Sequence, residues 1–430
     1  MLRSTWRALR HCLETPSANR RRRCRPAAAS VVCRVERLES RVLLSAVGTE
    51  TAVAPTMINN QLATGPSSVA SDDAGNYVVT WTENTPGPSS SFTSYAQRYD
   101  ASGVAQGSKI TIAGRDTQVA MDADGDFVVT YQNGPTGSSF IYAQRFDKNG
   151  VLQGTIQIDD VGSSGNDSDA RIAMDDAGDF VVTWIDLVQP GVNIYARKYS
   201  SAGVAQGAAI LVSSDPGLAF PAVAMDADGD FVVAWATEVD IPGGTISSMT
   251  TVWAQRYNSS GVAQGSVIEV SSGLTAANQR PDVSMDPTGN FVVVWSGYNE
   301  FDMSSVFAQR FSSLGVAQGS VLQVNASASI DFEDGGPSVD TDGSGNFVVT
   351  WTQTGANPDG SLDVFGQQFD ASGVRRGGEF LVNTTTDKQQ AASSVAMDAT
   401  GEFVVVWNSA IDAPNLHNVF FQRFDSNPGA

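Results

Sequence analysis

A short segment that recurs seven times is the strongest constraint on the fold of this chain. Its second copy, Met121–Tyr131, reads Met-Asp-Ala-Asp-Gly-Asp-Phe-Val-Val-Thr-Tyr. Every copy has an Asp, a Gly three residues later, and an apolar stretch that ends in an aromatic residue. The aromatic positions, which lie 50 to 60 residues apart, are Trp81, Tyr131, Trp184, Trp235, Trp295, Trp351 and Trp407. A period of this length is typical of propellers and solenoids.

Each repeat predicts four short strands. In the fourth copy these are Pro221–Met225, Phe231–Trp235, Val252–Tyr257 and Ser266–Val270. The second strand alternates in period two between large aromatic or branched residues and smaller ones, as strands do. No segment of the repeats keeps a 3.6-residue period, so we expect almost no helix. A four-stranded unit cannot bury both faces alone, whereas neighbours stacked in a ring bury them all.

Two of the connections in each repeat have a fixed length. Strands one and two are joined by Asp-x-x-Gly in all seven copies, and strands three and four by Asp/Asn/Ser-x-x-Gly in six. This is the chemistry of a type I turn, in which the first side chain accepts backbone N–H bonds and Gly supplies a positive φ. The other two connections vary in length and must emerge on the opposite face of a ring of blades.

The sequence therefore predicts an all-β protein, a closed seven-bladed β-propeller of four-stranded antiparallel blades over residues 49–430. Residues 1–48 form an Arg-rich targeting segment that we expect to be disordered or processed. The seventh repeat ends after its third strand, Val419–Phe424. We expect Thr56–Gln61 to supply the missing outer strand and close the ring.

The charge is divided unevenly along the chain. Residues 1–46 hold eleven Arg and three Glu, which leaves 15 basic and 43 acidic residues in the remainder. Such an acidic body is unsuited to a phosphate backbone, so a nucleic-acid partner is not expected. All three cysteines, Cys12, Cys24 and Cys33, precede the repeats, which therefore contain no disulfide. Apolar runs are too short for a transmembrane helix.

The segment before the repeats resembles a known export motif. Residues 35–46 are similar to the Leu-Glu-Pro-Arg-x-Leu-Leu motif near the start of many bacterial surface and secreted proteins. The matching residues are Leu38, Glu39, Arg41, Leu43 and Leu44, while Ser40 stands in place of Pro. The resemblance implies export, and hence an extracellular or cell-surface location.

The repeats themselves resemble a second family. Val306–Asn325 and Asp342–Trp351 carry the Gln-Arg-Phe-x-x-x-Gly and Asp-x-x-Gly-Asn-Phe-Val-Val-x-Trp patterns of repeats in large bacterial surface and secreted proteins. This resemblance implies a β-propeller and an extracellular setting, and it implies no catalytic activity.

Calcium is the first ligand that the acidic turns suggest. The weak candidate ligands form two Asp-x-Asp-x-Asp runs, Asp122, Asp124, Asp126 and Asp226, Asp228, Asp230. An EF-hand loop would need an acidic residue at position twelve, where this chain has Asn133 and Thr237. We therefore interpret the Asp-x-x-Gly segments as structural turns and expect no cofactor, with calcium as the alternative.

Nucleophilic catalysis finds little support. The repeats contain one histidine, His417, and no cysteine, so a Ser or Cys triad cannot be assembled from them. A carboxylate pair for glycoside hydrolysis stays open. We expect the recurrent Trp residues in the core, and the strand-three Arg residues on the sheet with their heads bonded to carboxylates or carbonyls.

A recognition surface must vary from point to point, so we place binding on the face with the variable loops. Candidate binding residues there are Glu238, Asp240, Glu300, Asp302, Asp359 and Asp363, together with Glu333 and Asp334. The resulting hypothesis is a non-catalytic extracellular propeller that binds a protein or glycan, or serves as envelope scaffold. The alternative is a secreted carbohydrate-active enzyme with loop carboxylates. A single acid pair with a raised pKa in one pocket would favour the enzyme.

Overall fold

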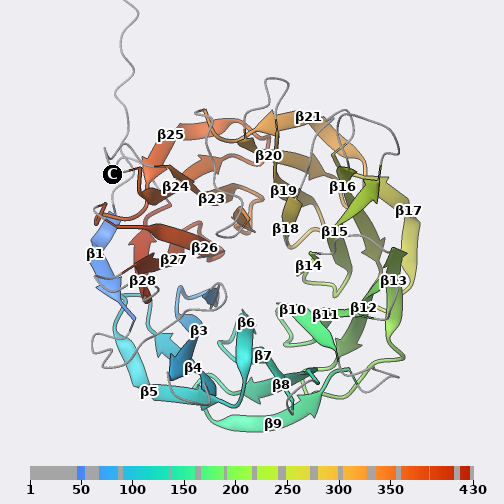
Figure 1. Cartoon of the computed structure of the whole chain (residues 1–430), viewed down its shortest axis with the longest axis horizontal. Coiled ribbons are helices and arrows are strands. Elements are labelled where there is room, and N and C mark those ends of the chain that lie inside the picture. Colours follow the sequence, from blue (N-terminus) through green and yellow to red (C-terminus); the bar gives the residue numbers. More distant parts are fainter. Residues whose placement is uncertain are drawn as a thin grey trace, which may run out of the picture. The chain divides into compact units, whose positions relative to one another are not determined.

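The computed structural model describes residues 46–53, 67–85, 91–134, 138–159, 166–187, 191–215, 220–240, 248–271, 279–298, 304–326, 336–354, 360–386, 388–410 and 417–426. These residues form seven four-stranded antiparallel sheets arranged as the blades of a ring (Figure 1). The described part of the chain contains no helix, and hence none that could span a membrane. The predicted seven-bladed β-propeller is confirmed.

Each blade runs from an inner strand at the axis to an outer strand at the rim (Figure 1). Blade 1 contains β2 (Ser68–Ser71), β3 (Tyr77–Thr85), β4 (Ser91–Tyr99) and β5 (Ala105–Ile112). Blade 2 contains β6 (Arg115–Met121), β7 (Phe127–Asn133), β8 (Phe140–Phe146) and β9 (Leu152–Gln157). Blade 3 contains β10 (Asp167–Met174), β11 (Phe180–Asp186), β12 (Val192–Tyr199) and β13 (Ile210–Asp215). Blades 4 and 5 contain β14 (Ala222–Met225), β15 (Phe231–Asp240), β16 (Ser248–Tyr257) and β17 (Ala263–Glu269); and β18 (Gln279–Met285), β19 (Phe291–Tyr298), β20 (Ser304–Phe311) and β21 (Ala317–Gln323). Blade 6 contains β22 (Ser338–Thr341), β23 (Phe347–Thr354), β24 (Leu362–Phe369) and β25 (Arg375–Leu381), and blade 7 contains β26 (Gln390–Met397), β27 (Phe403–Ala410), β28 (His417–Phe424) and β1 (Ala46–Ala52).

The N-terminal strand closes the ring, but it is a different strand from the one expected. Residues 46–52 pair antiparallel with β28, with Ala46 opposite Phe424 and Ala52 opposite Phe420. The expected strand, Thr56–Gln61, lies outside the described residues. The expectation assumed a constant distance from an outer strand to the next inner strand. That connection has 8 residues between β25 and β26 but 15 between β1 and β2.

Side-chain contacts explain why β1 takes this place. Glu50 Oε2 accepts hydrogen bonds from the backbone N–H and the hydroxyl of Thr384 and from the N–H of Thr385, at 2.8, 2.5 and 3.0 Å. Just after the strand, Val53 is buried in the apolar cluster between blades 7 and 1. The ring is therefore closed by the pairing of β1 with β28, by the hydrogen bonds of Glu50 and by the burial of Val53.

The core is divided among the interfaces between blades. Seven apolar clusters fill these interfaces, one for each neighbouring pair. In β15, Phe231, Val233 and Trp235 pack against blade 3, while Val232 and Ala234 pack against blade 5. The predicted alternation is thus confirmed. The six recurrent Trp side chains are at most 4% exposed, as expected for core residues.

The tight turns have the predicted conformation and also lock each blade. The turn Gly residues have φ between 75° and 94°. Asp122 Oδ1 accepts the N–H groups of Asp124 and Asp126 at 3.1 and 2.9 Å. Asp126 Oδ1 in turn accepts the N–H of Lys148 at 2.8 Å, in the turn between strands three and four. Asp122 therefore shapes its own turn, and Asp126 joins the two turns of the blade.

The recurrent basic residue of strand three joins neighbouring blades. Arg98 Nη1 donates to the carbonyl of Asn149 at 2.6 Å, and Arg310 Nη1 to that of Ser372 at 2.6 Å. Each acceptor lies in the outer turn of the following blade. In blade 3, the buried Lys198 takes this place and donates to two carbonyls of blade 4. The prediction that these heads bond to carbonyls is confirmed for these three residues.

Candidate functional site

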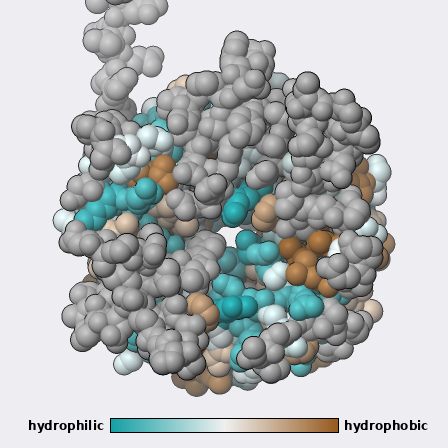
Figure 2. Space-filling model, viewed as in Figure 1, coloured by the Kyte–Doolittle hydropathy of each residue, from teal (hydrophilic) through white to brown (hydrophobic). Residues whose placement is uncertain are grey.

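A cavity in the described part of the chain lies on the axis of the propeller. It has a volume of about 880 Å³, and its walls are the inner strands of all seven blades. Figure 2 shows hydrophilic residues bordering the opening at the centre of the disc. Because the inner strands run from the variable-loop side to the tight turns, the cavity connects these two faces.

The side chains at one register of the inner strands differ from blade to blade. Taken at one register, opposite the same position of strand two, they are Ser68, Gln118, Arg171, Ala222, Asp282, Ser338 and Ser394. Two residues further along, the register holds Ala in five blades, Ser284 in blade 5 and Asp340 in blade 6. The blades are otherwise near-copies, so these positions break the repetition of the fold.

Two carboxylates occupy adjacent inner strands on one wall of the channel. Asp282 Oδ2 accepts the N–H of Val339 at 2.9 Å, and Asp340 Oδ2 accepts the N–H of Met397 at 2.8 Å. Both donors belong to the next blade, on the edge of its inner strand. Asp340 Oδ1 also accepts the hydroxyl of Ser284 at 2.9 Å. These bonds fix the direction of both carboxylates, while both side chains remain only half-buried at the channel.

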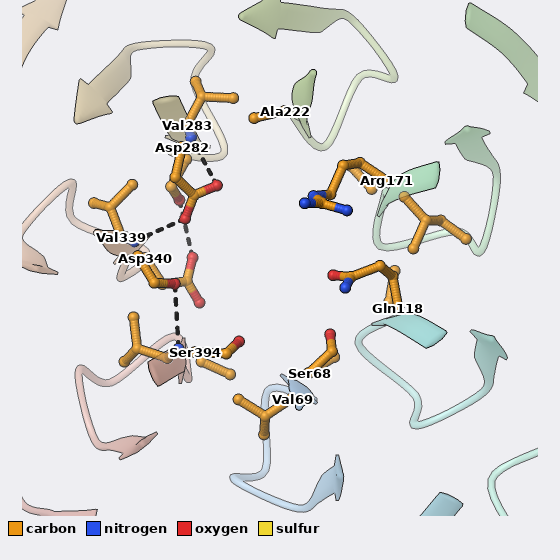
Figure 3. A pocket seen from close by; sticks show the side chains of 18 of the residues that line it. Ser68, Val69, Gln118, Arg171, Ala222, Asp282, Val283, Val339, Asp340 and Ser394 are labelled. Atoms are coloured by element: carbon orange, nitrogen blue, oxygen red, sulfur yellow. Dashed lines mark hydrogen bonds between the residues drawn. The ribbon is translucent and has the colours of Figure 1, made fainter. Parts of the chain in front are cut away.

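Arg171 lies on the opposite wall and points across the channel towards these carboxylates, with Gln118 beside it (Figure 3). Arg171 Nη1 donates to the carbonyl of Ala170 at 3.1 Å. Within the described ranges, Arg171 forms no ion pair. A guanidinium has five N–H donors, so most of them face the cavity. The channel thus has one wall of acceptors and one wall of donors.

The environment of the acid pair shifts its protonation. Burial raises the pKa of Asp340 to about 6, against the lowering effect of the bonds from Met397, Thr341 and Ser284, and the charge of Asp282 adds to the rise. Burial also raises the pKa of Asp282, which the charge of Arg171 opposes in part. The pKa of Asp340 therefore lies well above that of an ordinary aspartate.

The variable-loop end of the channel is shaped by a strained backbone. Asp116, Asp169, Arg280 and Ala392 have φ between 49° and 57° and occupy the same register in four blades. Each lies inside a bulge of its inner strand. A non-glycine residue in this region costs on the order of 1–3 kcal/mol. Two residues later, Gln118, Arg171, Asp282 and Ser394 line the channel. The equivalent residues Ser68, Ala222 and Ser338 line it as well, in blades whose inner strands have no bulge.

One aromatic side chain also lines this end of the cavity. Phe220 lies just before β14, and the guanidinium of Arg280 lies over its ring, 5.1 Å from the ring centroid. Nearby, Arg115 and Asp116 form an ion pair at 3.4 Å. Burial raises the pKa of Asp116, and Arg115 opposes the rise. The mouth of the channel is therefore mixed in charge, with one apolar platform.

The sequence-predicted binding residues do not form this site. Glu238 and Asp240 lie in β15, opposite Thr250 and Ser248 of β16, because strands two and three extend further than expected. Asp363 lies in β24, is 2% exposed, and accepts a hydrogen bond from Asn383 Nδ2 at 2.8 Å, which is a structural contact. The remaining candidates, Glu300, Asp302, Glu333, Asp334 and Asp359, fall outside the described residues.

Four of the six candidate calcium ligands, Asp122, Asp126, Asp226 and Asp230, accept hydrogen bonds from backbone N–H groups of the turns. Asp226 Oδ1 accepts the N–H groups of Asp228 and Asp230 at 3.1 and 2.9 Å, and Asp230 Oδ1 accepts the N–H of Ser259 at 2.7 Å. Asp122, Asp124 and Asp126 are arranged in the same way. In the part of the chain that the structure describes, no three His, Cys, Asp or Glu side chains converge on a position for a metal ion.

Sequence reasoning missed Gln118, Arg171, Asp282 and Asp340. All of them are ordinary polar residues in a chain with many such residues. Aligning the seven repeats on the turn Asp would have revealed the signal, because the register four residues before it, Asp282 in blade 5, differs in most copies.

Comparison with protein-family models and with curated proteins finds no match. Solved structures match across most of the chain at very low identity. The polysaccharide lyase Uly1 has 10% identity and a TM-score of 0.52, with 88% of this chain and 94% of the lyase covered. An α-L-arabinanase from Penicillium chrysogenum has 11% identity and a TM-score of 0.46, with 89% and 98% covered. The likeness to the lyase shows the fold alone.

Proposed function

We propose that this protein is an exported, non-catalytic propeller that binds a glycan at the variable-loop end of its axial channel. The observation that carries the proposal is the broken repetition of the inner strands. A residue that the fold needs recurs in every blade, as the turn Asp and Gly do. Arg171 and Gln118 occur once each at their register and point into the axial cavity, and within the described residues no hydrogen bond or ion pair joins their side chains to a neighbouring blade.

The chemistry of the channel favours a glycan. Sugar hydroxyls donate and accept hydrogen bonds at once, so they suit a wall of carboxylates that faces a guanidinium and an amide. A cavity of about 880 Å³ with few convergent polar groups is of the size that takes small ligands and chain ends. The frame itself is compatible with this use, since Uly1, which is named a polysaccharide lyase, has the same fold.

Export rests on the segment before the propeller. Its similarity to the Leu-Glu-Pro-Arg-x-Leu-Leu motif and its excess of Arg over the acidic body support delivery to the cell surface or beyond. A fusion of residues 1–48 to a reporter should direct the reporter to the envelope or medium, and Arg41→Ala with Leu43→Ala should retain it in the cell. Retention of the unaltered fusion would contradict export.

Glycan binding is tested with the folded propeller on an array of plant, algal and bacterial glycans, followed by calorimetry. Arg171→Ala and Gln118→Ala should each weaken the measured affinity by about tenfold, because each removes hydrogen bonds to the ligand. Lys148→Ala, an exposed change in a tight turn, is the matched control and should leave affinity unchanged. If Lys148→Ala weakens the affinity and Arg171→Ala does not, the binding site lies on the face of the tight turns and the proposal is wrong.

An enzyme is the second candidate, and the raised pKa of Asp340 beside Asp282 is the observation that favours it. General acids of glycoside hydrolases have such raised pKa values. Against it, every carboxylate oxygen of the pair already accepts a bond from the protein. Release of new chain ends from a bound glycan by the wild type, abolished in Asp340→Asn, would establish the enzyme and replace the binding proposal.

A further inference from the structure

We infer that the axial channel recognises the free end of an uncharged glycan chain and does not bind internal segments. This inference rests on the proposed function and specifies the ligand of the same site. Two observations carry it, namely the enclosure of the cavity by strands on all sides and the opposition of charges across it.

Enclosure decides how a chain can enter. The walls of the cavity come from β2, β6, β10, β14, β18, β22 and β26, one inner strand from each blade. A groove open along its length accepts the middle of a polymer, whereas a channel walled on every side accepts a chain only along its axis. A glycan therefore has to present an end to reach Arg171, Asp282 and Asp340, which Figure 3 shows around the same opening.

Charge decides what the end can carry. An anionic sugar at Arg171 would face Asp282 and Asp340 on the other wall (Figure 3), and it would approach a body with many more acidic than basic residues. A cationic amino sugar at the carboxylates would face Arg171. A hydroxyl group meets neither repulsion, because it can donate to Asp282 or Asp340 and accept from Arg171.

The two walls also differ in their freedom to bind. Asp340 Oδ1 accepts from Thr341 N–H and the Ser284 hydroxyl, and Oδ2 from Met397 N–H. A carboxylate has about four lone-pair sites, so Asp340 retains one acceptor site in a direction that the protein fixes. Arg171 keeps donors that contact neither a carboxylate nor a second blade in the described residues. The terminal sugar thus donates a hydrogen bond to Asp340, whose direction is fixed, and accepts one from Arg171, whose donors are free to adjust.

The first experiment counts chain ends. The neutral polysaccharide that binds best on the array is partly cleaved with an endo-acting enzyme, so that the number of ends per gram rises while composition stays the same. The amount of protein bound per gram should rise in proportion to the ends. An amount that stays constant, or that falls, would overturn end recognition while leaving glycan binding intact.

The second experiment tests charge with defined probes. Neutral gluco- and manno-oligosaccharides are compared with oligogalacturonides and with chitosan oligosaccharides of equal length. Neutral probes should bind at least tenfold more tightly than either charged set, and their affinity should change less than about twofold between 50 and 500 mM salt, since screening acts on charged pairs. Arg171→Ala should weaken the neutral probes about tenfold.

The outcomes separate the two proposals. Tighter binding of a charged probe, or a steep salt dependence, would overturn the inference that the bound chain end is uncharged, while the proposal of glycan binding would stand. Absence of binding to every glycan on the array would overturn the proposed function and this inference together. Lys148→Ala, measured in parallel, controls for changes in the amount of folded protein.

Discussion

Asp398 of the last blade lies against Gly75 of the first, with its Oδ2 atom 3.1 Å from the position that a Cβ atom on Gly75 would occupy. The same relationship joins every pair of neighbouring blades, at 2.9 to 3.2 Å. The Asp of each turn thus shapes its own turn through Oδ1 and abuts the following blade through Oδ2. The Gly is needed twice, for its positive φ and for this close approach.

These two requirements can be separated by mutation. Gly178 has φ +81°, and a Cβ there would lie 3.0 Å from Asp122 Oδ2 and 3.1 Å from Ser201 Cβ. Gly265 has a similar φ of +73° but open space around it. We expect Gly178→Ala to lower the free energy of unfolding by about 2–3 kcal/mol and Gly265→Ala by about 1 kcal/mol. Equal losses in urea denaturation would show that the contact between blades is unimportant.

Ring closure by β1 gives a second prediction. Removing residues 46–53 takes away the outer strand of blade 7, the hydrogen bonds of Glu50 and the buried Val53. It also leaves β28 as an unpaired edge strand. We expect the melting temperature to fall on the order of 10 °C. Glu50→Ala alone should cost about 1–2 kcal/mol. Lys109→Ala, which removes an exposed ion pair with Glu83, is the control and should change little.

The turns, the alternation in strand two and the number of blades could be predicted because each is local and repeated seven times. Asp122 to Gly125 fixes a turn whatever surrounds it, and Phe231 to Trp235 needs only a period of two. The closing strand could not be predicted, because nothing local distinguishes residues 46–52 from Thr56–Gln61. What distinguishes them is Glu50 meeting Thr384, which are more than three hundred residues apart in sequence.

The site was missed for a related reason. Arg171 and Asp282 line the channel because their register of the inner strand faces the axis of the closed ring. The closure of the whole ring is not visible in a single repeat. The loop acids were favoured because variable loops usually carry binding, and the difference between blades at one register of strand one went unused.

The interface between blades 3 and 4 gives a third prediction. Lys198 is 6% exposed, and its ammonium donates to the carbonyls of Gly229 and Ser259 at 3.0 and 3.2 Å. Lys198→Met should cost about 1–3 kcal/mol of unfolding free energy, since the buried carbonyl of Gly229 and the part-buried carbonyl of Ser259 lose their donor. Arg98→Met, the equivalent change at a more exposed position, should cost less. The opposite order in chemical denaturation would refute this account of the interface.

The turn carboxylates give a prediction about metal removal. Asp122 and Asp226 are satisfied by backbone N–H groups of their own turns. Removing divalent ions with a chelator should therefore shift the melting temperature by less than about 1 °C, because no bound ion is lost from the native state. A large fall that calcium restores would support the calcium interpretation. Asp124→Ala and Asp228→Ala would then show which turn holds the ion.

The last prediction concerns pH and Asp340. Its pKa is about 6 in the folded protein and near 3.8 when unfolded. The folded state therefore holds a proton that the unfolded chain has lost between these values, so the contribution of Asp340 to stability is greatest below pH 4. It declines as pH rises, and the decline ends a little above pH 6. Replacing the carboxyl by a group that does not titrate removes this decline.

The measurement compares urea denaturation of the wild type and Asp340→Ser at pH 4.5, 5.5, 6.5 and 7.5. Carboxyls with raised pKa values in the turns, such as Asp122 and Asp226, act in the same direction in both proteins and cancel in the difference. The difference in unfolding free energy, wild type minus variant, should fall from pH 4.5 to 6.5 and then stay level. A difference that rises with pH would mean that Asp340 is stabilised as the anion by its three donors, in spite of its burial.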